Sequence, residues 1–205
     1  MTENKNHWYD GWFYDRFIAP NQHRLFRQIK NLIPAQSAII DVGCGTGRLA
    51  FLLSGRNKSI LGIDLSKRNI DRAQLLLFRR PNDKISFQHS TISDIRMQGL
   101  AHFDFAVLTY VIHEVAEAER IDLLNEIGQI ADRIIIGDYL APQPKSFSNH
   151  LTRIIEFLAG ADHYKNYKSY MANGGIYHLA DKAGLKIIKE IANQPSTNHI
   201  VVLGR

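Results

Sequence analysis

Short apolar runs rich in β-branched residues recur along the chain, and segments with helical periodicity separate most of them. Runs of this length, bounded by polar or turn-forming residues, are typical of strands that a parallel sheet buries. They predict strands over Ser37–Val42, Ser59–Asp64, Ile85–His89, Phe103–Thr109, Arg133–Asp138, Lys186–Ile191 and His199–Gly204.

The intervening segments place apolar residues three and four positions apart, as on one face of a helix. The helices predicted in this way are Gln22–Ile33, Thr46–Ser54, Lys67–Arg80, Glu117–Ala131 and a segment near Ile176–Ala183. This alternation predicts an α/β fold with a Rossmann-like, seven-stranded, mostly parallel sheet and helices on both faces. The last two strands have no helix between them, so we expect them to pair antiparallel at one edge.

No internal repeat, low-complexity tract or linker divides the chain, so we expect residues 1–205 to form a single domain. Residues 1–33 are expected to form an N-terminal helical cap, in which Trp12 or Tyr14 covers a ligand or simply packs on the core. Residues 139–175 are predicted to be an insertion that forms a lid above the sheet. The insertion holds an amphipathic stretch, Ser146–Gly160, followed by an aromatic and basic one.

The composition, 45% hydrophobic and 22% charged residues, is ordinary for a folded protein. The single cysteine excludes an internal disulfide framework and suits a reducing compartment. No apolar run reaches the roughly 18 residues of a membrane span, and the first residues lack a secretory signal. We therefore expect a soluble, cytoplasmic protein of unknown oligomeric state.

The net charge of +5 raises the question of a polyanionic partner. The basic residues are scattered, whereas a nucleic-acid surface normally gathers them in a stripe interleaved with aromatic residues. This pattern disfavours nucleic acid and leaves an anionic small molecule or peripheral contact with a membrane surface open.

The strongest chemical signal is the segment from Ile39 to Gly47, in which an apolar strand runs into three glycines at alternate positions. Glycine lets the backbone turn sharply and approach a ligand closely, and the following helix presents free N–H groups. The dinucleotide fingerprint needs a glycine at position 48, which is Arg48 here. A nicotinamide-dependent oxidoreductase is therefore disfavoured.

The string Asp41-Val-Gly-Cys-Gly-Thr-Gly resembles the first motif of the class I S-adenosylmethionine-dependent methyltransferases. In that family the loop wraps the methionine part of the cofactor. The resemblance implies S-adenosyl-L-methionine as cofactor and S-adenosyl-L-homocysteine as product. It implies cofactor contacts from Asp41, Gly43, Cys44, Gly45, Thr46 and Gly47, with Cys44 a loop filler and not a nucleophile.

Two further strand ends correspond to motifs of this family, and the second departs from the family pattern. Asp64, followed by Leu65, can accept hydrogen bonds from both ribose hydroxyls, although it could instead favour a helix N-terminus. After the third strand the family often has an acid that meets the adenine amino group, but this chain has Ser90. The adenine contact then falls to Ser90, Thr91 or backbone groups, and Ile92 packs either on the adenine or in the core.

The fourth strand leads into Tyr110, His113 and Glu114, a string similar to those of small-molecule methyltransferases, including ubiquinone and menaquinone biosynthesis enzymes. We expect Tyr110 near the cofactor and His113 to be a general base. Alternatively, His113 opens the next helix or hydrogen-bonds the cofactor. Glu114 either orients His113 or favours a helix N-terminus. Asp138 holds an acceptor amine or hydroxyl, or is structural.

The predicted function is methyl transfer from S-adenosylmethionine to a small molecule. The lid suggests an amphiphilic or anionic acceptor, lined by His150, Arg153, His163, Tyr164 and Tyr167. One alternative is an RNA or protein methyltransferase, which the charge favours. The other is a non-catalytic cofactor-binding scaffold, which Ser90 favours slightly and which the intact Asp41, Gly43, Gly45, Gly47 and Asp64 disfavour. The spacing of the nine histidines predicts no metal site.

Overall fold

The structure is a computed structural model that describes residues 19–99, 102–142, 161–193 and 198–205. Its sheet has seven strands in the order β3-β2-β1-β4-β5-β7-β6. The strands are β1 (Ala38–Val42), β2 (Ser59–Asp64), β3 (Ile85–His89), β4 (Phe103–Thr109), β5 (Ala131–Tyr139), β6 (Lys186–Ala192) and β7 (Asn198–Gly204). β7 is antiparallel to both β5 and β6. The predicted Rossmann-like, mostly parallel sheet with an antiparallel edge is confirmed.

The helices are α1 (Ala19–Leu32), α2 (Arg48–Leu53), α3 (Lys67–Arg79), α4 (Ile92–Met97), α5 (Arg120–Ile130), α7 (Ala161–Ala172) and α8 (Gly175–Lys182), with a 3₁₀ turn over Glu117–Glu119. Periodicity did not predict α4, which is too short to show a repeating apolar face. It did not predict α7 either, because its aromatic and basic residues obscure the pattern. None of the described helices is long and apolar enough to cross a membrane.

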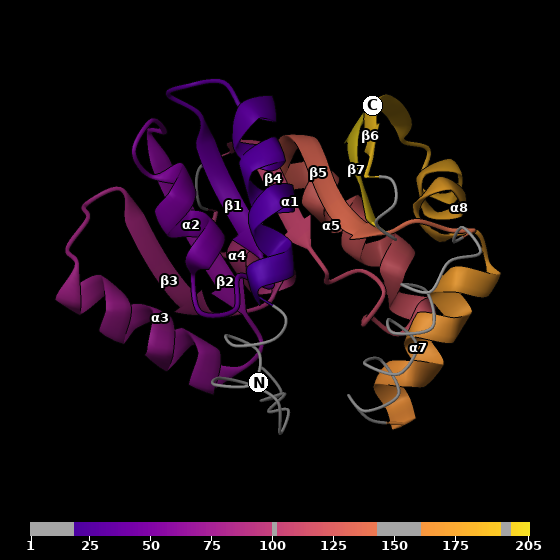
Figure 1. The fold of residues 1–205 in the computed structure, drawn as a ribbon, viewed down its shortest axis with the longest axis horizontal. Helices are drawn as coiled ribbons and strands as arrows, with labels where there is room; N and C mark the ends of the chain where they lie inside the picture. Colours follow the sequence, from indigo (N-terminus) through magenta and orange to yellow (C-terminus); the bar gives the residue numbers. More distant parts are fainter. Residues whose placement is uncertain (1–18, 100–101, 143–160, 194–197) are drawn as a thin grey trace. The chain divides into compact units, whose positions relative to one another are not determined.

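The chain divides into two compact units, which are described separately: residues 1–107 with 130–132, and residues 108–129 with 133–205. In the first unit β1 pairs with β2 and β2 with β3, all parallel (Figure 1). Ile39, Ile40 and Ile60 are completely or almost completely buried, as expected of parallel strands covered by helices. α3 packs on β2 and β3. Its first turn is capped by the Ser66 hydroxyl, which accepts from the Asn69 N–H.

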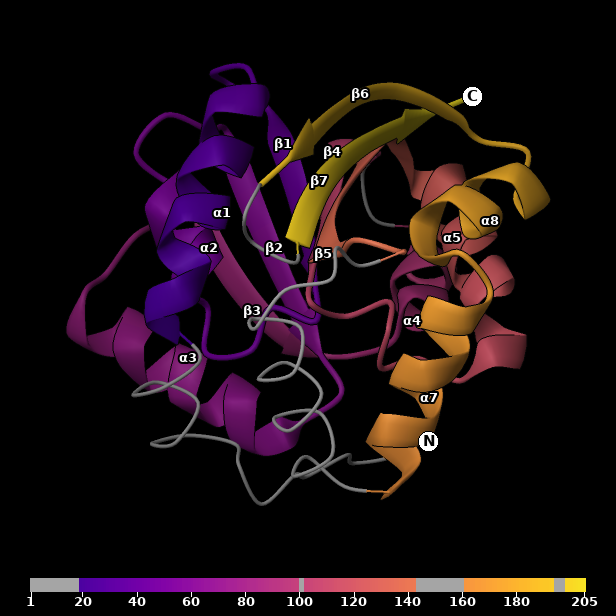
Figure 2. The same cartoon turned by 45° about the vertical axis from the view of Figure 1, so that its right-hand side comes forward.

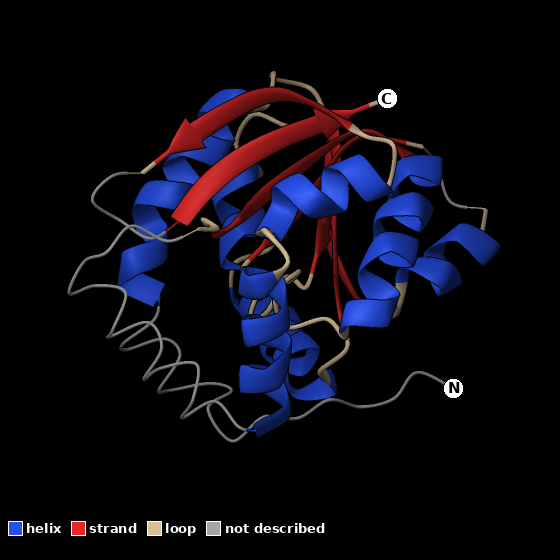
Figure 3. Ribbon diagram, turned by 90° about the vertical axis from the view of Figure 1, so that its right-hand side faces the viewer, coloured by secondary structure: helices blue, strands red, loops and turns tan. Residues whose placement is uncertain are grey.

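In the second unit β6 and β7 lie side by side and continue into the pairing of β7 with β5 (Figures 2 and 3). α8 packs against β6 and α7. Six of the seven β7 residues are buried, whereas β6 is almost wholly exposed. The edge strand carries Lys186, Lys189 and Glu190, charges that oppose edge-to-edge association.

Candidate functional site

The glycine-rich loop of the first unit leaves β1 through backbone conformations that only glycine adopts readily. Gly43, Gly45 and Gly47 have φ values of 70°, 54° and 82°. The N–H groups of Gly43 and Cys44 both donate to the carbonyl of Ile63 in β2, at 2.8 and 2.9 Å. The loop is therefore held to the neighbouring strand before α2 begins at Arg48.

The glycines of this region serve two different purposes. A Cβ at Gly47 would overlap the ring of Phe87, and a Cβ at Gly62 would lie 2.6 Å from the same ring. These two glycines are needed for packing. A Cβ at Gly45, by contrast, would meet nothing within 4 Å. The backbone at Gly45 thus borders open space, as a loop that approaches a ligand would.

Two acidic residues of the first unit lie next to this loop. Asp41 is 1% exposed, and neither of its carboxylate oxygens has a hydrogen-bond partner among the described residues. Burial, followed by the charge of Asp64, raises the pKa of Asp41 to about 7. A buried carboxyl group without donors is costly, so this position suits a ligand that brings a donor or a positive charge.

Asp64 ends β2 and already accepts hydrogen bonds on both oxygens. Oδ2 accepts from the Gly45 N–H at 2.8 Å, and Oδ1 from the Ser66 N–H at 2.8 Å. Asn69 Nδ2 also donates to Oδ1, at 3.4 Å, so these bonds fix the orientation of the Asp64 carboxylate. Asp64 also lies beside the start of α3, as its alternative role expects, whereas its contact with the ribose stays a prediction.

Cys44 and Thr46 are buried in the loop. Burial raises the pKa of the Cys44 thiol well above its usual range, so Cys44 is not an activated nucleophile. Its Sγ lies 3.6 Å from the carbonyl oxygen of Gly45. This agrees with the predicted role as a filler.

The segment after β3 begins a helix that the sequence analysis did not predict. Thr91 and Asp94 form a capping box at the start of α4, in which each side chain accepts from the other residue's N–H. The Thr91 hydroxyl also donates to Asp94 Oδ2 at 2.7 Å. Asp94 therefore has a structural role, and Thr91 is held by the same cap. Ser90 and Ile92 are buried beside them.

In the second unit, the residue that follows β4 has an uncommon backbone conformation. Tyr110 has a φ of 56°, which is rare for a residue with a Cβ and clusters at functional sites. Its N–H donates to the carbonyl of Gly137 in β5 at 2.8 Å, and its hydroxyl accepts from Asn198 Nδ2 at 2.9 Å. These bonds stabilise the turn that leads to His113.

His113 and Asp138 form a buried pair. Nδ1 of His113 lies 2.7 Å from Oδ1 of Asp138, and the side chains are 2% and 0% exposed. A carboxylate only accepts hydrogen bonds, so Nδ1 carries the proton and Nε2 presents its lone pair. The N–H of Tyr139 also donates to Asp138, at 2.7 Å. The carboxylate that orients His113 is therefore Asp138 and not Glu114, whose Oε1 is 4.0 Å from Nε2.

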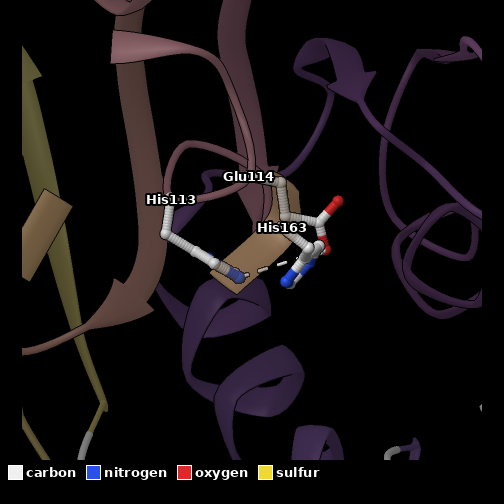
Figure 4. A group of neighbouring side chains, drawn as sticks. All are labelled: His113, Glu114 and His163. Atoms are coloured by element: carbon white, nitrogen blue, oxygen red, sulfur yellow. Dashed lines mark ion pairs between the residues drawn. The ribbon is translucent and has the colours of Figure 1, made fainter. Parts of the chain in front are cut away.

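Glu114 is associated with a histidine from α7. Nε2 of His163 lies 2.9 Å from Oε1 of Glu114, an ion pair when the imidazole is protonated (Figure 4). The His113 and His163 rings are 5.6 Å apart between centroids. The tertiary structure thus brings a predicted lid residue to the predicted catalytic pair. Tyr139, Tyr167 and Tyr170 also have their ring edges or faces near His113.

Arg120 holds this arrangement together, and the sequence analysis did not identify it. This buried guanidinium donates to the carbonyls of Val115 at 2.9 Å and Asn166 at 2.6 Å. Asn166 Nδ2 donates in turn to the carbonyl of Glu114. The turn after β4 is thereby bonded to α7. A lone arginine at a helix start gives no sequence signal for such a role.

Among the other predicted lid and cap residues, the structure describes Tyr164 and Tyr167. Tyr167 is buried, and Tyr164 stacks near it with ring centroids 6.5 Å apart. The ammonium of Lys168 lies 5.6 Å from the centre of the Tyr164 ring. Trp12, Tyr14, His150 and Arg153, with the predicted stretch Ser146–Gly160, lie outside the described residues.

Known proteins resemble the chain in sequence and fold. A family model described as a methyltransferase domain matches residues 39–132. The chain is 29% identical over 174 residues to the O-methyltransferase cnsE of Penicillium expansum. The aligned region covers 80% of this chain and 58% of that protein. It is 24% identical over 159 residues to the ubiquinone biosynthesis O-methyltransferase of Nitrosomonas europaea, which covers 74% and 64%. The chain therefore spans less than two thirds of each relative's length.

Among solved structures, the magnesium protoporphyrin IX methyltransferase of Synechocystis PCC 6803 with bound SAH matches with a TM-score of 0.66. The identity is 17%, over 95% of this chain and 88% of that one, so the likeness shows the fold. A glycine-rich turn after the first strand of such a sheet, with an acid after the second, defines a Rossmann-like protein that binds a nucleotide-containing cofactor. Together with the matched domain, these features support a class I S-adenosylmethionine-dependent methyltransferase, with S-adenosylmethionine as cofactor.

Proposed function

We propose that the chain transfers the methyl group of S-adenosylmethionine to an oxygen atom of a small-molecule acceptor. The observation that carries this proposal is Asp41, a buried carboxyl group without a donor, in the unit whose loop borders open space at Gly45. Two curated relatives are named as O-methyltransferases, which supports oxygen as the methylated atom.

The cofactor contacts that we propose come from the first unit. Asp41, whose buried carboxyl group has no donor among the described residues, would pair with the ammonium of the methionine part. Asp64, whose carboxylate is oriented by the Gly45 N–H, would accept from the ribose hydroxyls. When bound, the cofactor supplies an electrophilic methyl group on its sulfonium. The further contacts proposed in this unit are Gly43, Cys44, Gly45, Thr46, Gly47, Leu65, Ser90, Thr91 and Ile92. The contact expected from Tyr110 stays a prediction.

The acceptor is proposed to meet His113 and Glu114, with Asp138 as a positioning residue that fixes the His113 ring. The rings of Tyr139, Tyr167 and Tyr170 bury His113 and limit its contact with water, which strengthens electrostatic interactions there. Within the single domain that we propose for residues 1–205, residues 1–33 act as a cap and residues 139–175 as the acceptor lid. We further propose an amphiphilic or anionic acceptor, because α7 carries both aromatic rings and ammonium groups, among them Tyr164 and Lys168.

The proposal is tested by supplying methyl-labelled S-adenosylmethionine and a cell extract to the purified chain. The extract is then separated into organic-soluble, small polar, RNA and protein fractions. We expect label in the organic-soluble or small polar fraction, much less with Asp64→Ala, and no loss with His102→Ala, whose exposed ion pair with Asp132 belongs to neither site. Label in RNA or protein would overturn the acceptor class. Binding of S-adenosylhomocysteine without any transfer would favour a scaffold.

A further inference from the structure

Three side chains of the second unit have the composition of a metal site that the spacing of the histidines in the sequence does not predict. One ligand atom from each of His113, Glu114 and His163 lies within 4.8 Å of the other two. His113 and Glu114 come from the turn after β4 and His163 from α7, and the three side chains converge (Figure 4). We propose that they bind a divalent transition-metal cation.

The distances fit such a cation. His163 Nε2 lies 2.9 Å from Glu114 Oε1, and His113 Nε2 lies 4.0 Å from the same oxygen. Two ligand atoms that each bind a metal at about 2.1 Å are roughly 3 Å apart at a right angle and roughly 4 Å apart when opposite. The ligand nitrogens of His113 and His163 lie within 4.8 Å of each other, so binding one cation requires a small approach of these two rings together with an adjustment of the Glu114 carboxylate, which is 40% exposed.

The surroundings support the same assignment. Metal-binding histidines usually donate their second ring N–H to a carboxylate, which fixes the ring. His113 does so to Asp138 at 2.7 Å. The charges of Glu114 and Asp138 together balance a divalent cation. The bonds from Arg120 and Asn166 hold the turn and α7 in place without a metal, so the ligands are prearranged.

The chemistry of the three ligands indicates which cations this site would bind. Two imidazoles and one carboxylate suit Zn²⁺, Fe²⁺ or Mn²⁺ better than Mg²⁺ or Ca²⁺, which prefer oxygen ligands. Three protein ligands leave coordination positions open, as catalytic sites require. We take Zn²⁺ as the first probe and Mn²⁺ as the second.

The catalytic part of this inference rests on the proposed function. The cation would bind the acceptor hydroxyl and lower its pKa, and the released proton would pass to solvent water. The acceptor oxygen then forms the new O–CH₃ bond with its electron pair, while the S–CH₃ bond breaks and leaves its pair on sulfur. His113 and Glu114 would thus meet the acceptor through the cation.

The test uses the full chain without a polyhistidine tag, made metal-free by dialysis against a chelator. Calorimetric titration with Zn²⁺ and then Mn²⁺ should show one cation per chain, and Co²⁺ should give the absorption bands of a histidine-ligated site. Glu114→Gln and His163→Gln should each raise the Kd at least tenfold, and Asp138→Asn should raise it by about 10–100-fold. His102→Ala is the matched control that removes an exposed histidine and should leave the Kd unchanged.

The outcomes separate the two proposals. No binding by the unaltered chain, or equal binding by Glu114→Gln and the unaltered chain, would overturn the metal site. Methyl transfer that continues in excess chelator would overturn its catalytic part and leave His113 to act directly, with the proposed function intact. Site-specific binding without methyl transfer to any fraction would support the metal site and count against the proposed function. Thermal melting of each variant identifies one that has merely failed to fold.

Discussion

The two units build their candidate sites in opposite ways. In the first, the chemical groups lie on neighbouring strand ends and in one continuous loop, from Asp41 to Gly47. In the second, the groups come from the turn after β4, from the end of β5 and from α7, which are far apart in the sequence. Local conformation organises the first site, and tertiary hydrogen bonds organise the second.

The buried carboxyl groups of Asp41 and Asp138 illustrate this difference between the two sites. Asp41 has no donor among the described residues, and its pKa is raised to about 7. Asp138 is equally buried but lies within bonding distance of His113 Nδ1 and the Tyr139 N–H. A buried polar group without a partner indicates a site that a ligand completes, whereas a satisfied one indicates a prearranged constellation.

The largest expected effect is a loss of turnover without a loss of cofactor affinity, which would distinguish the acceptor site from the cofactor site. His113→Ala should lower kcat at least about 100-fold, because it removes the group that we propose to meet the acceptor. The Kd for S-adenosylhomocysteine should not change, since the proposed contacts to that ligand do not include His113. Steady-state kinetics and calorimetry measure the two quantities. A comparable loss of cofactor binding would contradict the separation.

The second prediction concerns Asp41. Its folded pKa of about 7 lies above the ordinary 3.8, so the folded state binds more protons than the unfolded state between these values. The free energy of unfolding should therefore fall as pH rises from about 4 through 7, by up to the order of 4 kcal/mol. Asp41→Asn should lack this contribution. Chemical unfolding of both proteins across this range measures it, and a difference between them that is independent of pH would contradict the assignment.

The third prediction distinguishes packing glycines from a ligand-facing glycine. Gly47→Ala should lower the free energy of unfolding by about 3 kcal/mol or more, because its Cβ overlaps Phe87 and its φ is positive. Gly45→Ala should cost only about 1–2 kcal/mol from the backbone conformation, since its Cβ meets nothing. Denaturant unfolding compares them directly. Equal losses would remove the distinction.

The fourth prediction concerns the effect of Asp64→Ala on cofactor affinity. Loss of charge-assisted hydrogen bonds to the ribose should weaken binding of S-adenosylhomocysteine by about 1.5–3 kcal/mol. Acceptor KM should change little, which contrasts with variants of the second unit. Calorimetry that finds an unchanged Kd would show that the ribose contact lies elsewhere.

The sequence analysis anticipated much of the fold, because strand composition and helical periodicity are local properties. It predicted β2, β3 and β4 with the observed bounds and the antiparallel pairing of β6 with β7. It missed α4, whose start depends on the capping box of Thr91 and Asp94. It also missed α7, because the aromatic and basic residues of that helix obscure the helical pattern. It named His163 only as one of several lid residues.

The sequence by itself determined the glycine-rich loop and the acid after β2, because contiguous residues at a strand end reach the same place whatever the rest of the chain does. It also determined which residues could do chemistry. Only the tertiary structure decided that Asp138 orients His113, that His163 meets Glu114 and that Arg120 bonds the turn after β4 to α7. These contacts join residues 25 to 49 positions apart in the sequence. Such pairings form because buried polar groups need hydrogen-bond partners when helices and strands pack together, and a local sequence pattern does not specify those partners.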